Sequence, residues 1–304
     1  MLANNKATSI CKSKVIKFSN DKKADIHAEI YTSAMEVASD CQSRPVRIDD
    51  YAVSHTYSDK DWYGVSTYQE ALDLLETGYQ AAVDDLRKAI ATNPQMEPRI
   101  TFKNNIQGFI PVVPLTLLNI PNNMIDVTMR PLKSKVIDLY YDMTACCHHK
   151  AKEFIDAGTL VLSTIVALEK QGYRLNLYAV QSYTRDSIVD FLCIKLKSSD
   201  RPTDLKRISF PLTHPAFFRV IGFDWQGKSP ITRNVGWGRG HDLLRDYTNE
   251  DVQCMANTMF GDNAIYISGV NILEHGFTQK DIQETLTYDR YKQRNMDTMS
   301  AMRA

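Results

Sequence analysis

Apolar side chains recur every three or four residues between Tyr68 and Ile90, which is the spacing of one face of an α-helix. The stretch opens with Ser66-Thr-Tyr-Gln69, which matches the capping box found at helix N-termini. Proline cannot continue a helix, so Asn93-Pro94 should end it. Gly78 interrupts the apolar stripe, and we expect a bend or close packing there. This is the clearest helix in the chain.

Strands and helices alternate from Val136 onward. The pattern predicts a strand at Val136 to Tyr141, a helix at Lys150 to Lys170, and strands at Tyr173 to Val180 and Ile188 to Lys197. The last strand alternates apolar and polar side chains, which favours an antiparallel neighbour and one wetter face. Gly158 should let the helix approach the sheet closely. Further predicted elements are a helical or mixed stretch over 204–223, a helix over 249–260, a strand over 264–268 and a helix over 279–286. The succession predicts an α/β fold, α+β overall, with a mixed, Rossmann-like sheet.

The first half of the chain is less regular. A strand is predicted at Val15 to Phe18, and a helix at Asp25 to Ala38 carries apolar residues at helical spacing. Prolines then cluster between Pro94 and Pro131 in what we interpret as a partly buried connector, with an edge strand at Phe109 to Val113. The predicted organisation is a mainly helical N-terminal region (1–98), a Pro-rich connector (99–131), an α/β domain (132–290) and a C-terminal tail (291–304).

Composition indicates which partners and which cellular compartment to expect. Acidic and basic residues balance at 36 each, so no overall positive charge makes nucleic acid the default partner. The six cysteines show no compact spacing and no apolar signal segment opens the chain, which favours reduced thiols in a cytoplasm. No stretch approaches the roughly 18 apolar residues of a membrane span. We expect a soluble protein with no membrane partner.

The strand at Val136 to Tyr141 runs into Asp142, where chemistry is expected because ligands collect at the carboxyl ends of strands in open α/β sheets. Asp142 and Thr144 offer the hard oxygen ligands that Mg²⁺ prefers. The next alternate position holds Cys146, a soft thiol that hard cations avoid. The competing interpretation is structural, with Asp142 capping the following turn or helix. Magnesium is the cofactor that such a site would take, and no other cofactor is expected.

The four residues from Cys146 to His149, Cys-Cys-His-His, are all of types that bind zinc. Adjacent residues point in different directions, however, and zinc sites usually draw on spaced ligand pairs, of which no second is evident. The sequence favours a loop in which one cysteine packs inward and both histidines face water. His214, in Thr-His-Pro, is predicted to order a turn before a helix at Pro215.

A glycine-rich stretch from Gly236 to His241 supports two interpretations. Its backbone could cradle a phosphate with charge from Arg233, Arg239 and Arg245, although it lacks the Lys-Ser/Thr ending of a P-loop. Alternatively it is an exposed protein-binding loop, since tryptophan and arginine, here Trp237 and its arginine neighbours, are frequent interface residues.

Two resemblances follow from ordered motifs. The segments GVSTYQEALDLLETG, VVPLTLLNIPNNM, LEKQGYRLNLY and ISFPLTHPAFFRVIGF, in this order over roughly 60–225, resemble a family of uncharacterised proteins encoded by tailed phages and prophages. That resemblance implies a viral protein in the host cytoplasm and implies no activity. The order strand, Asp142-x-Thr144, long helix, strand is similar to the start of a von Willebrand factor A domain, which holds a divalent cation with Asp-x-Ser-x-Ser. Cys146 departs from that motif.

Three functional hypotheses remain. The absence of catalytic motifs favours a non-enzymatic phage protein that binds a host or phage protein, sequestering or inhibiting a host factor such as a defence complex. The alternatives are a metal-dependent enzyme on nucleic acid or nucleotides, built on Asp142, and a nucleic-acid-binding protein using Arg233, Arg239 and Arg245 with Trp237. The Met-rich end, 288–304, supports two interpretations: an amphipathic helix that docks on a partner or on a sister subunit, which would give a homo-oligomer, or a disordered tail.

Overall fold

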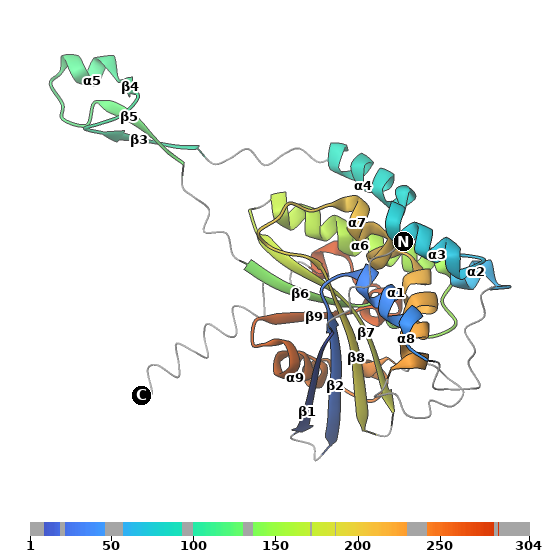
Figure 1. Cartoon of the computed structure of the whole chain (residues 1–304). Helices are drawn as coiled ribbons and strands as arrows, with labels where there is room; N and C mark the ends of the chain where they lie inside the picture. Colours follow the sequence, from blue (N-terminus) through green and yellow to red (C-terminus); the bar gives the residue numbers. More distant parts are fainter. Residues whose placement is uncertain are drawn as a thin grey trace.

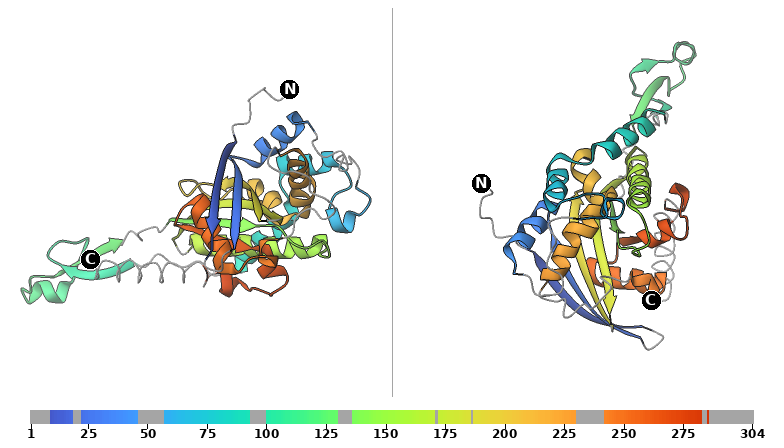
Figure 2. Two further views of the ribbon diagram at one scale, coloured as in Figure 1. Left: turned by 90° about the horizontal axis from the view of Figure 1, so that it is seen from below. Right: turned by 90° about the vertical axis from the view of Figure 1, so that its right-hand side faces the viewer.

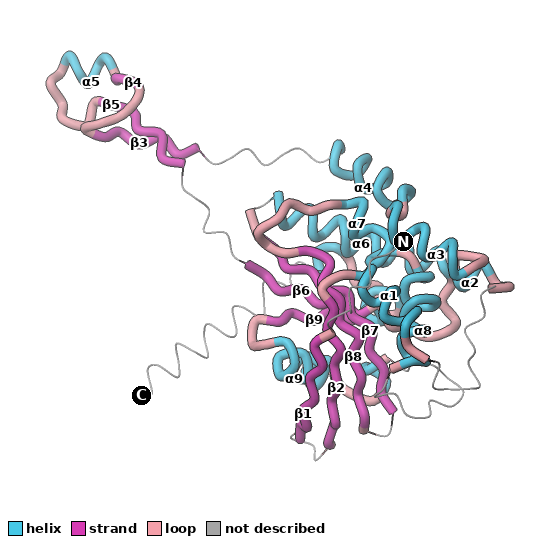
Figure 3. The backbone as a smooth tube through the Cα atoms, in the orientation of Figure 1, coloured by secondary structure: helices cyan, strands magenta, loops and turns pink. Residues whose placement is uncertain are grey.

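The computed structural model describes residues 9–18, 22–45, 57–92, 100–129, 136–170, 172–185, 187–229, 242–282 and 285. Its body is a six-stranded mixed sheet with the strand order β1-β2-β8-β7-β6-β9. Figure 1 shows these strands with helices around them, and Figure 3 separates the two by colour. The strands are β1 (Ile10–Lys17), β2 (Lys23–Tyr31), β6 (Val136–Asp142), β7 (Arg174–Arg185), β8 (Ile188–Lys197) and β9 (Ala264–Ser268). The predicted α/β class is confirmed.

Helices cover both faces of this sheet. On one face, helix α6 (Ala151–Lys170) shares a core with most of the others, and on the opposite face α9 (Asn249–Phe260) covers a second core. The helices that pack with α6 are α1 (Ala34–Ser43), α3 (Tyr68–Thr77), α4 (Gln80–Thr92), α7 (Leu205–Thr213), the π-helix η2 (Phe217–Gly222), α8 (Phe223–Lys228) and α10 (Gly269–Leu273). The short helices α2 (Lys60–Tyr63) and η3 (Leu243–Arg245) complete the body.

Strand β6 occupies a special place in the sheet. It pairs in parallel with β7 on one side and with β9 on the other. The chain reaches β7 through α6, which packs on one face, and it enters β9 directly from α9, which packs on the other. The carboxyl ends of β6 and β9 therefore lie at a topological switch point, which is where open α/β sheets bind ligands. Strand β7 pairs antiparallel with β8, as predicted.

Helix α6 approaches its neighbour closely at Gly158. A Cβ atom there would lie 2.3 Å from the carbonyl oxygen of Leu212 and 2.4 Å from Cα of Thr213. The predicted close approach is confirmed, but its partner is α7 and not the sheet. The two helices can meet this closely because glycine has no side chain.

A second, three-stranded sheet forms from residues that were predicted to be a connector. Its strand order is β3 (Ile100–Asn105), β5 (Met124–Met129), β4 (Ile110–Pro111), with helix α5 (Val113–Leu117) following β4. We call this unit, 100–129, the small sheet. Pro111 lies in an edge strand, as predicted. Figures 1 and 2 show the small sheet apart from the body.

The structure differs from the predicted N-terminal helix. Residues predicted to be helical from Asp25 include strand β2, and α1 begins only at Ala34. The cause is the spacing: Ile26, Ile30 and Ala34 are four apart, and residues four apart share a face in a strand as well as in a helix. Strands β1 and β2 belong to the main sheet, whereas the described residues from Ala34 to Thr92 are mainly helical, as predicted for the N-terminal region.

The long predicted helix is two helices. Thr67 caps α3 by accepting from the backbone N–H of Glu70, one residue beyond the predicted box. Gly78 has a φ of 80°, and a Cβ atom there would lie 2.4 Å from the carbonyl oxygen of Lys206, so it provides both the break and the close packing.

Strand β8 is buried along almost its whole length, so the prediction that one of its faces is wetter is wrong. Helix α9 covers that face.

The tail at 291–304 lies outside the described residues. Within the described ranges, no helix is both long and apolar enough to cross a membrane.

Candidate functional site

Asp142 ends β6 and is 1% exposed. Its Oδ1 accepts from the backbone N–H groups of Thr144 at 2.9 Å and Ser182 at 3.3 Å. Its Oδ2 accepts from the hydroxyls of Ser182 and Tyr266. Burial raises the pKa of this carboxyl, although the hydrogen bonds act against the rise. Because Ser182 lies in β7 and Tyr266 in β9, Asp142 joins three adjacent strands.

Thr144 takes part in the same arrangement. Its hydroxyl donates to the carbonyl of Ser182 and accepts from the Ser182 N–H, both at 2.8 Å. The oxygens offered for a cation by Asp142 and Thr144 therefore already have protein partners. The bond from Thr144 N–H to Asp142 matches the alternative prediction, in which Asp142 caps the following turn.

The loop that follows Thr144 is held in place by side chains of α2 and η2, which donate to its backbone carbonyl groups. The indole N–H of Trp62, in α2, donates to the carbonyl of Cys147 at 2.6 Å. Arg219, in η2, donates from Nη2 to the carbonyl of His149 at 2.8 Å and from Nη1 to the carbonyl of Trp62 at 2.5 Å. The Arg219 guanidinium also lies 4.0 Å from the Trp62 ring centroid. These contacts set the direction in which the histidine side chains leave the loop.

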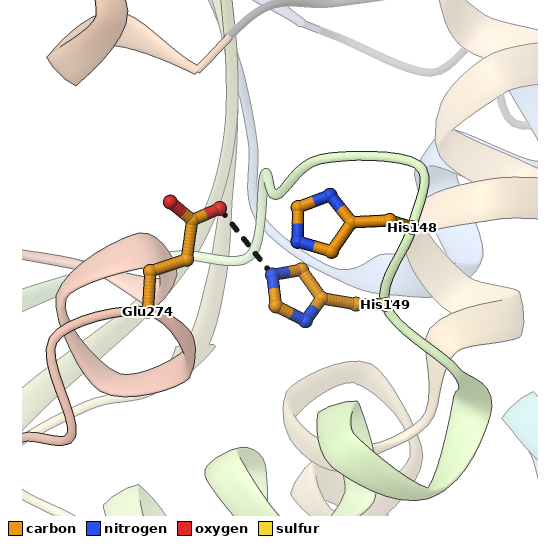
Figure 4. Close-up of side chains that lie close together, drawn as sticks. All are labelled: His148, His149 and Glu274. Atoms are coloured by element: carbon orange, nitrogen blue, oxygen red, sulfur yellow. Dashed lines mark hydrogen bonds and ion pairs between the residues drawn. The ribbon is translucent and has the colours of Figure 1, made fainter.

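His148 and His149 point toward Glu274, at the end of α10 (Figure 4). His148 is exposed, as predicted, but the prediction that both histidines face water is wrong, because the His149 side chain is 7% exposed. Its Nδ1 lies 3.1 Å from Oε2 of Glu153, and its Nε2 lies 3.3 Å from Oε1 of Glu274. One potential ligand atom from each of His148, His149 and Glu274 lies within 4.8 Å of the others.

Cys146 adds a thiol beside this cluster. Its Sγ lies 4.0 Å from Oδ2 of Asp242. Burial raises the pKa of the thiol, and the neighbouring carboxylates of Glu274 and Asp242 raise it further. A nucleophilic cysteine needs the opposite influence, which is a nearby positive charge or base that favours the thiolate. Cys146 therefore lacks the surroundings of a catalytic thiol. All six cysteines are free.

The predicted phosphate- or protein-binding loop, 236–241, lies outside the described residues. Arg233, Trp237 and Arg239 lie outside the described residues. Arg245 lies at the end of η3 and is exposed.

His214 is buried and follows α7, where its Nδ1 accepts from the Ala216 N–H at 3.3 Å, so the predicted turn is confirmed.

The small sheet carries a surface that the sequence interpretation missed. Its large apolar side chains were expected to be partly buried, yet Phe109 and Leu117 are each 82% exposed. We define the apolar surface as Ile106, Phe109, Ile110, Val113, Leu117, Leu118 and Ile120, which are all exposed. A signal was available: Lys103 and Asp126 are the only charged residues between 100 and 129. Uncharged apolar stretches of this kind occur at interfaces as well as in cores.

Fold and site together define a mixed-sheet α/β protein with a histidine-carboxylate cluster at its switch point and an exposed apolar surface on the small sheet. Residues 14–296 match the profile of a family described as a domain of unknown function (DUF7192), and the chain belongs to that family. The match includes both the six-stranded body and the small sheet. Comparison with curated proteins and with solved structures finds no match.

Proposed function

We propose that this protein acts by binding another protein, and that the apolar surface of the small sheet is its binding site. The exposure of that surface carries the proposal. Val113 is 60%, Leu118 70% and Ile106 69% exposed, beside the still more exposed Phe109 and Leu117. Soluble monomers rarely leave large apolar side chains clustered in water, and such clusters usually mark an interaction site.

The chemistry of this surface favours a protein over other partners. Nucleic acid is bound through its phosphates, and residues 100–129 contain one basic residue, Lys103. Attraction to anionic lipid likewise needs several lysines or arginines beside the apolar groups. Interface cores between proteins, by contrast, are depleted in charge and rich in apolar and aromatic side chains. A partner with an uncharged, apolar groove fits this composition.

The identity of the partner is proposed from the sequence resemblance to tailed-phage proteins. We take the partner to be a host or phage protein in the cytoplasm of an infected cell. The proposed action is non-enzymatic: the protein occupies the partner and so sequesters or inhibits a host complex, such as a defence complex. A second copy of this chain is the competing occupant of the apolar surface.

A photo-crosslinking experiment tests the proposal directly. A photoreactive phenylalanine analogue replaces Phe109 in one protein and Leu117 in another, and the products are irradiated in phage-infected cells. We expect both positions to crosslink to the same protein, identified by mass spectrometry. The complex is then rebuilt from purified components, and Val113→Asp should weaken it about tenfold or more, because a charge would be buried in an apolar contact.

Val15 provides a matched control, because it is also 60% exposed but lies on β1 in the body. The same analogue at Val15 should give no crosslink, and Val15→Asp should leave binding unchanged. The proposal fails if crosslinks from Phe109 and Leu117 join only copies of this chain, or if Val113→Asp and Val15→Asp have the same effect on the rebuilt complex.

A further inference from the structure

The cluster at His149 contains an arrangement that needs a positive charge. Glu153 Oε2 accepts from the Lys150 N–H at 2.9 Å and faces His149 Nδ1 at 3.1 Å. As carboxylates, neither Glu153 nor Glu274 has a proton to donate, whereas a neutral imidazole has one N–H to donate. With that proton on Nδ1, His149 donates to Glu153, which the Lys150 N–H also holds in place. In a neutral imidazole the other nitrogen, Nε2, then presents a lone pair.

That lone pair faces a second acceptor. Oε1 of Glu274 lies 3.3 Å from Nε2 of His149, and a carboxylate oxygen also offers lone pairs. Two acceptors at this distance repel each other unless a proton or a cation lies between them. The two ways to satisfy the pair are a second proton on His149 or a metal ion bound by both groups.

The spacing of these atoms fits a metal ion. Two ligand atoms that each lie about 2.0–2.1 Å from a tetrahedral zinc ion are about 3.3–3.4 Å apart. His149 Nε2 and Glu274 Oε1 have this separation, 3.3 Å. The ring of His148 has its centroid 4.1 Å from that of His149, and because His148 is exposed, its side chain has room to turn its nitrogen toward the same point (Figure 4).

We propose that His148, His149 and Glu274 bind a divalent transition-metal ion of the zinc class. Imidazole nitrogen suits zinc and its neighbours, whereas Mg²⁺ and Ca²⁺ prefer sites made of oxygen alone. Glu153 is a positioning residue: it holds the Nδ1–H of His149 and turns Nε2 toward the ion, as carboxylates do behind many zinc-binding histidines. Three protein ligands leave a fourth coordination position open to water or to a ligand.

The place of the cluster in the fold supports this assignment independently. His148 and His149 lie in the loop after β6, and Glu274 lies at the end of α10, which follows β9, so the ligands come from the segments after the two strands whose carboxyl ends form the switch point. Trp62 and Arg219 donate to carbonyl groups of the loop, so the loop is held in place through its backbone and not through its imidazole nitrogens. Adjacent histidines can therefore serve one ion here, although neighbouring side chains on a strand could not.

Calorimetric titration of the full-length protein tests the site. The protein is first treated with a chelator and then titrated with ZnCl₂ and, separately, with MgCl₂. We expect one zinc per chain and no magnesium binding. His148→Ala and Glu274→Gln should each weaken zinc binding by about 100-fold, and Glu153→Gln by about tenfold. Both ligand positions are exposed, so these variants should keep the fold, which circular dichroism checks.

Two controls separate the site from other zinc-binding groups. His275→Ala removes an exposed histidine next to Glu274 that is outside the cluster, and should leave the affinity unchanged. Replacing the exposed thiols Cys11, Cys147 and Cys254 by serine should keep one zinc per chain. The proposal is overturned if the protein binds less than one zinc, or if His148→Ala and Glu274→Gln bind zinc as well as the unmodified chain.

Discussion

The body and the small sheet place polar and apolar groups in opposite ways. Inside the body, the carboxylate of Glu29 is fully buried and accepts from Arg44 at 3.1 Å and from the indole of Trp225 at 2.8 Å. Tyr31 also donates to it, at 2.8 Å. On the small sheet, Phe109 and other large apolar side chains face water. One unit buries charge, and the other exposes hydrophobic surface.

The two units differ in how far the chain itself provides partners for their side chains. A buried carboxylate is tolerated only where donors surround it, and Tyr31, Arg44 and Trp225 supply them from within the chain. We call these three residues and Glu29 the Glu29 network. The apolar surface has no such internal cover among the described residues. The body thus pairs its buried charge within the chain, whereas the apolar surface is the part that we propose a partner covers.

The largest loss of stability is expected from removing the buried carboxylate of Glu29. Glu29→Ala leaves the Arg44 guanidinium and the Trp225 N–H without their shared acceptor inside the body. Breaking a buried pair in this way costs about 3–5 kcal/mol of the free energy of unfolding. Urea denaturation followed by circular dichroism measures the loss.

An exposed ion pair is the control. Asp85 lies 3.3 Å from Lys88, and both side chains are largely in water, so Asp85→Ala should cost less than about 1 kcal/mol. Equal losses for Glu29→Ala and Asp85→Ala would show that the Glu29 network does not stabilise the body.

A second prediction uses pH to probe the body. Burial lowers the pKa of His214 from its ordinary 6.5 to about 4. The folded protein thus binds this proton less readily than the unfolded chain does, so acid favours unfolding. The contribution of neutral His214 is fully present above about pH 6.5 and is lost as the pH falls through about 4. The total effect at pH 4 is about 3 kcal/mol.

The measurement is the free energy of unfolding across this pH range in the unmodified chain and in His214→Gln, which cannot titrate there. The unmodified chain should lose about 3 kcal/mol more than the variant between pH 7 and 4. His275→Gln removes an exposed histidine and should retain the full pH dependence. Parallel curves for the unmodified chain and His214→Gln would contradict the prediction.

Sequence patterns predicted the second half of the fold better than the first. Helix α9 and strand β9 have the predicted bounds, because their apolar periodicities are unambiguous and each element ends at a break in the pattern. Strand β2 was missed because Ile26 and Ile30 lie four residues apart, a spacing that a helix and a strand both allow. Its pairing with β8 joins residues far apart in the chain, which local periodicity cannot reveal.

The candidate site could be predicted only as a location. Asp142 at the end of a strand indicated the edge of the sheet at which the cluster of His148, His149 and Glu274 lies. The partner of His149, however, is Glu274, 125 residues further along, and no local pattern links them. The orientation of the two histidines depends on Trp62 and Arg219, which are also remote in sequence from the loop. The exposure of Phe109 is likewise a property of the assembled fold. Apolar stretches occur both in cores and on surfaces, and the sequence alone does not distinguish the two.

The smallest effect on the free energy of unfolding is expected for Leu117, an exposed leucine of the small sheet. Leu117→Ser should change the free energy of unfolding by no more than about 0.5 kcal/mol, because a side chain that is 82% exposed has little packing to lose. All three tryptophans lie outside 100–129, and two of them, Trp62 and Trp225, lie in helices of the body. Tryptophan fluorescence therefore does not report on the small sheet, whereas hydrogen–deuterium exchange of the amides in 100–129 does. Faster exchange in Leu117→Ser would show that this leucine holds the small sheet together. Unchanged exchange combined with lost partner binding would assign its apolar side chain to the interface alone.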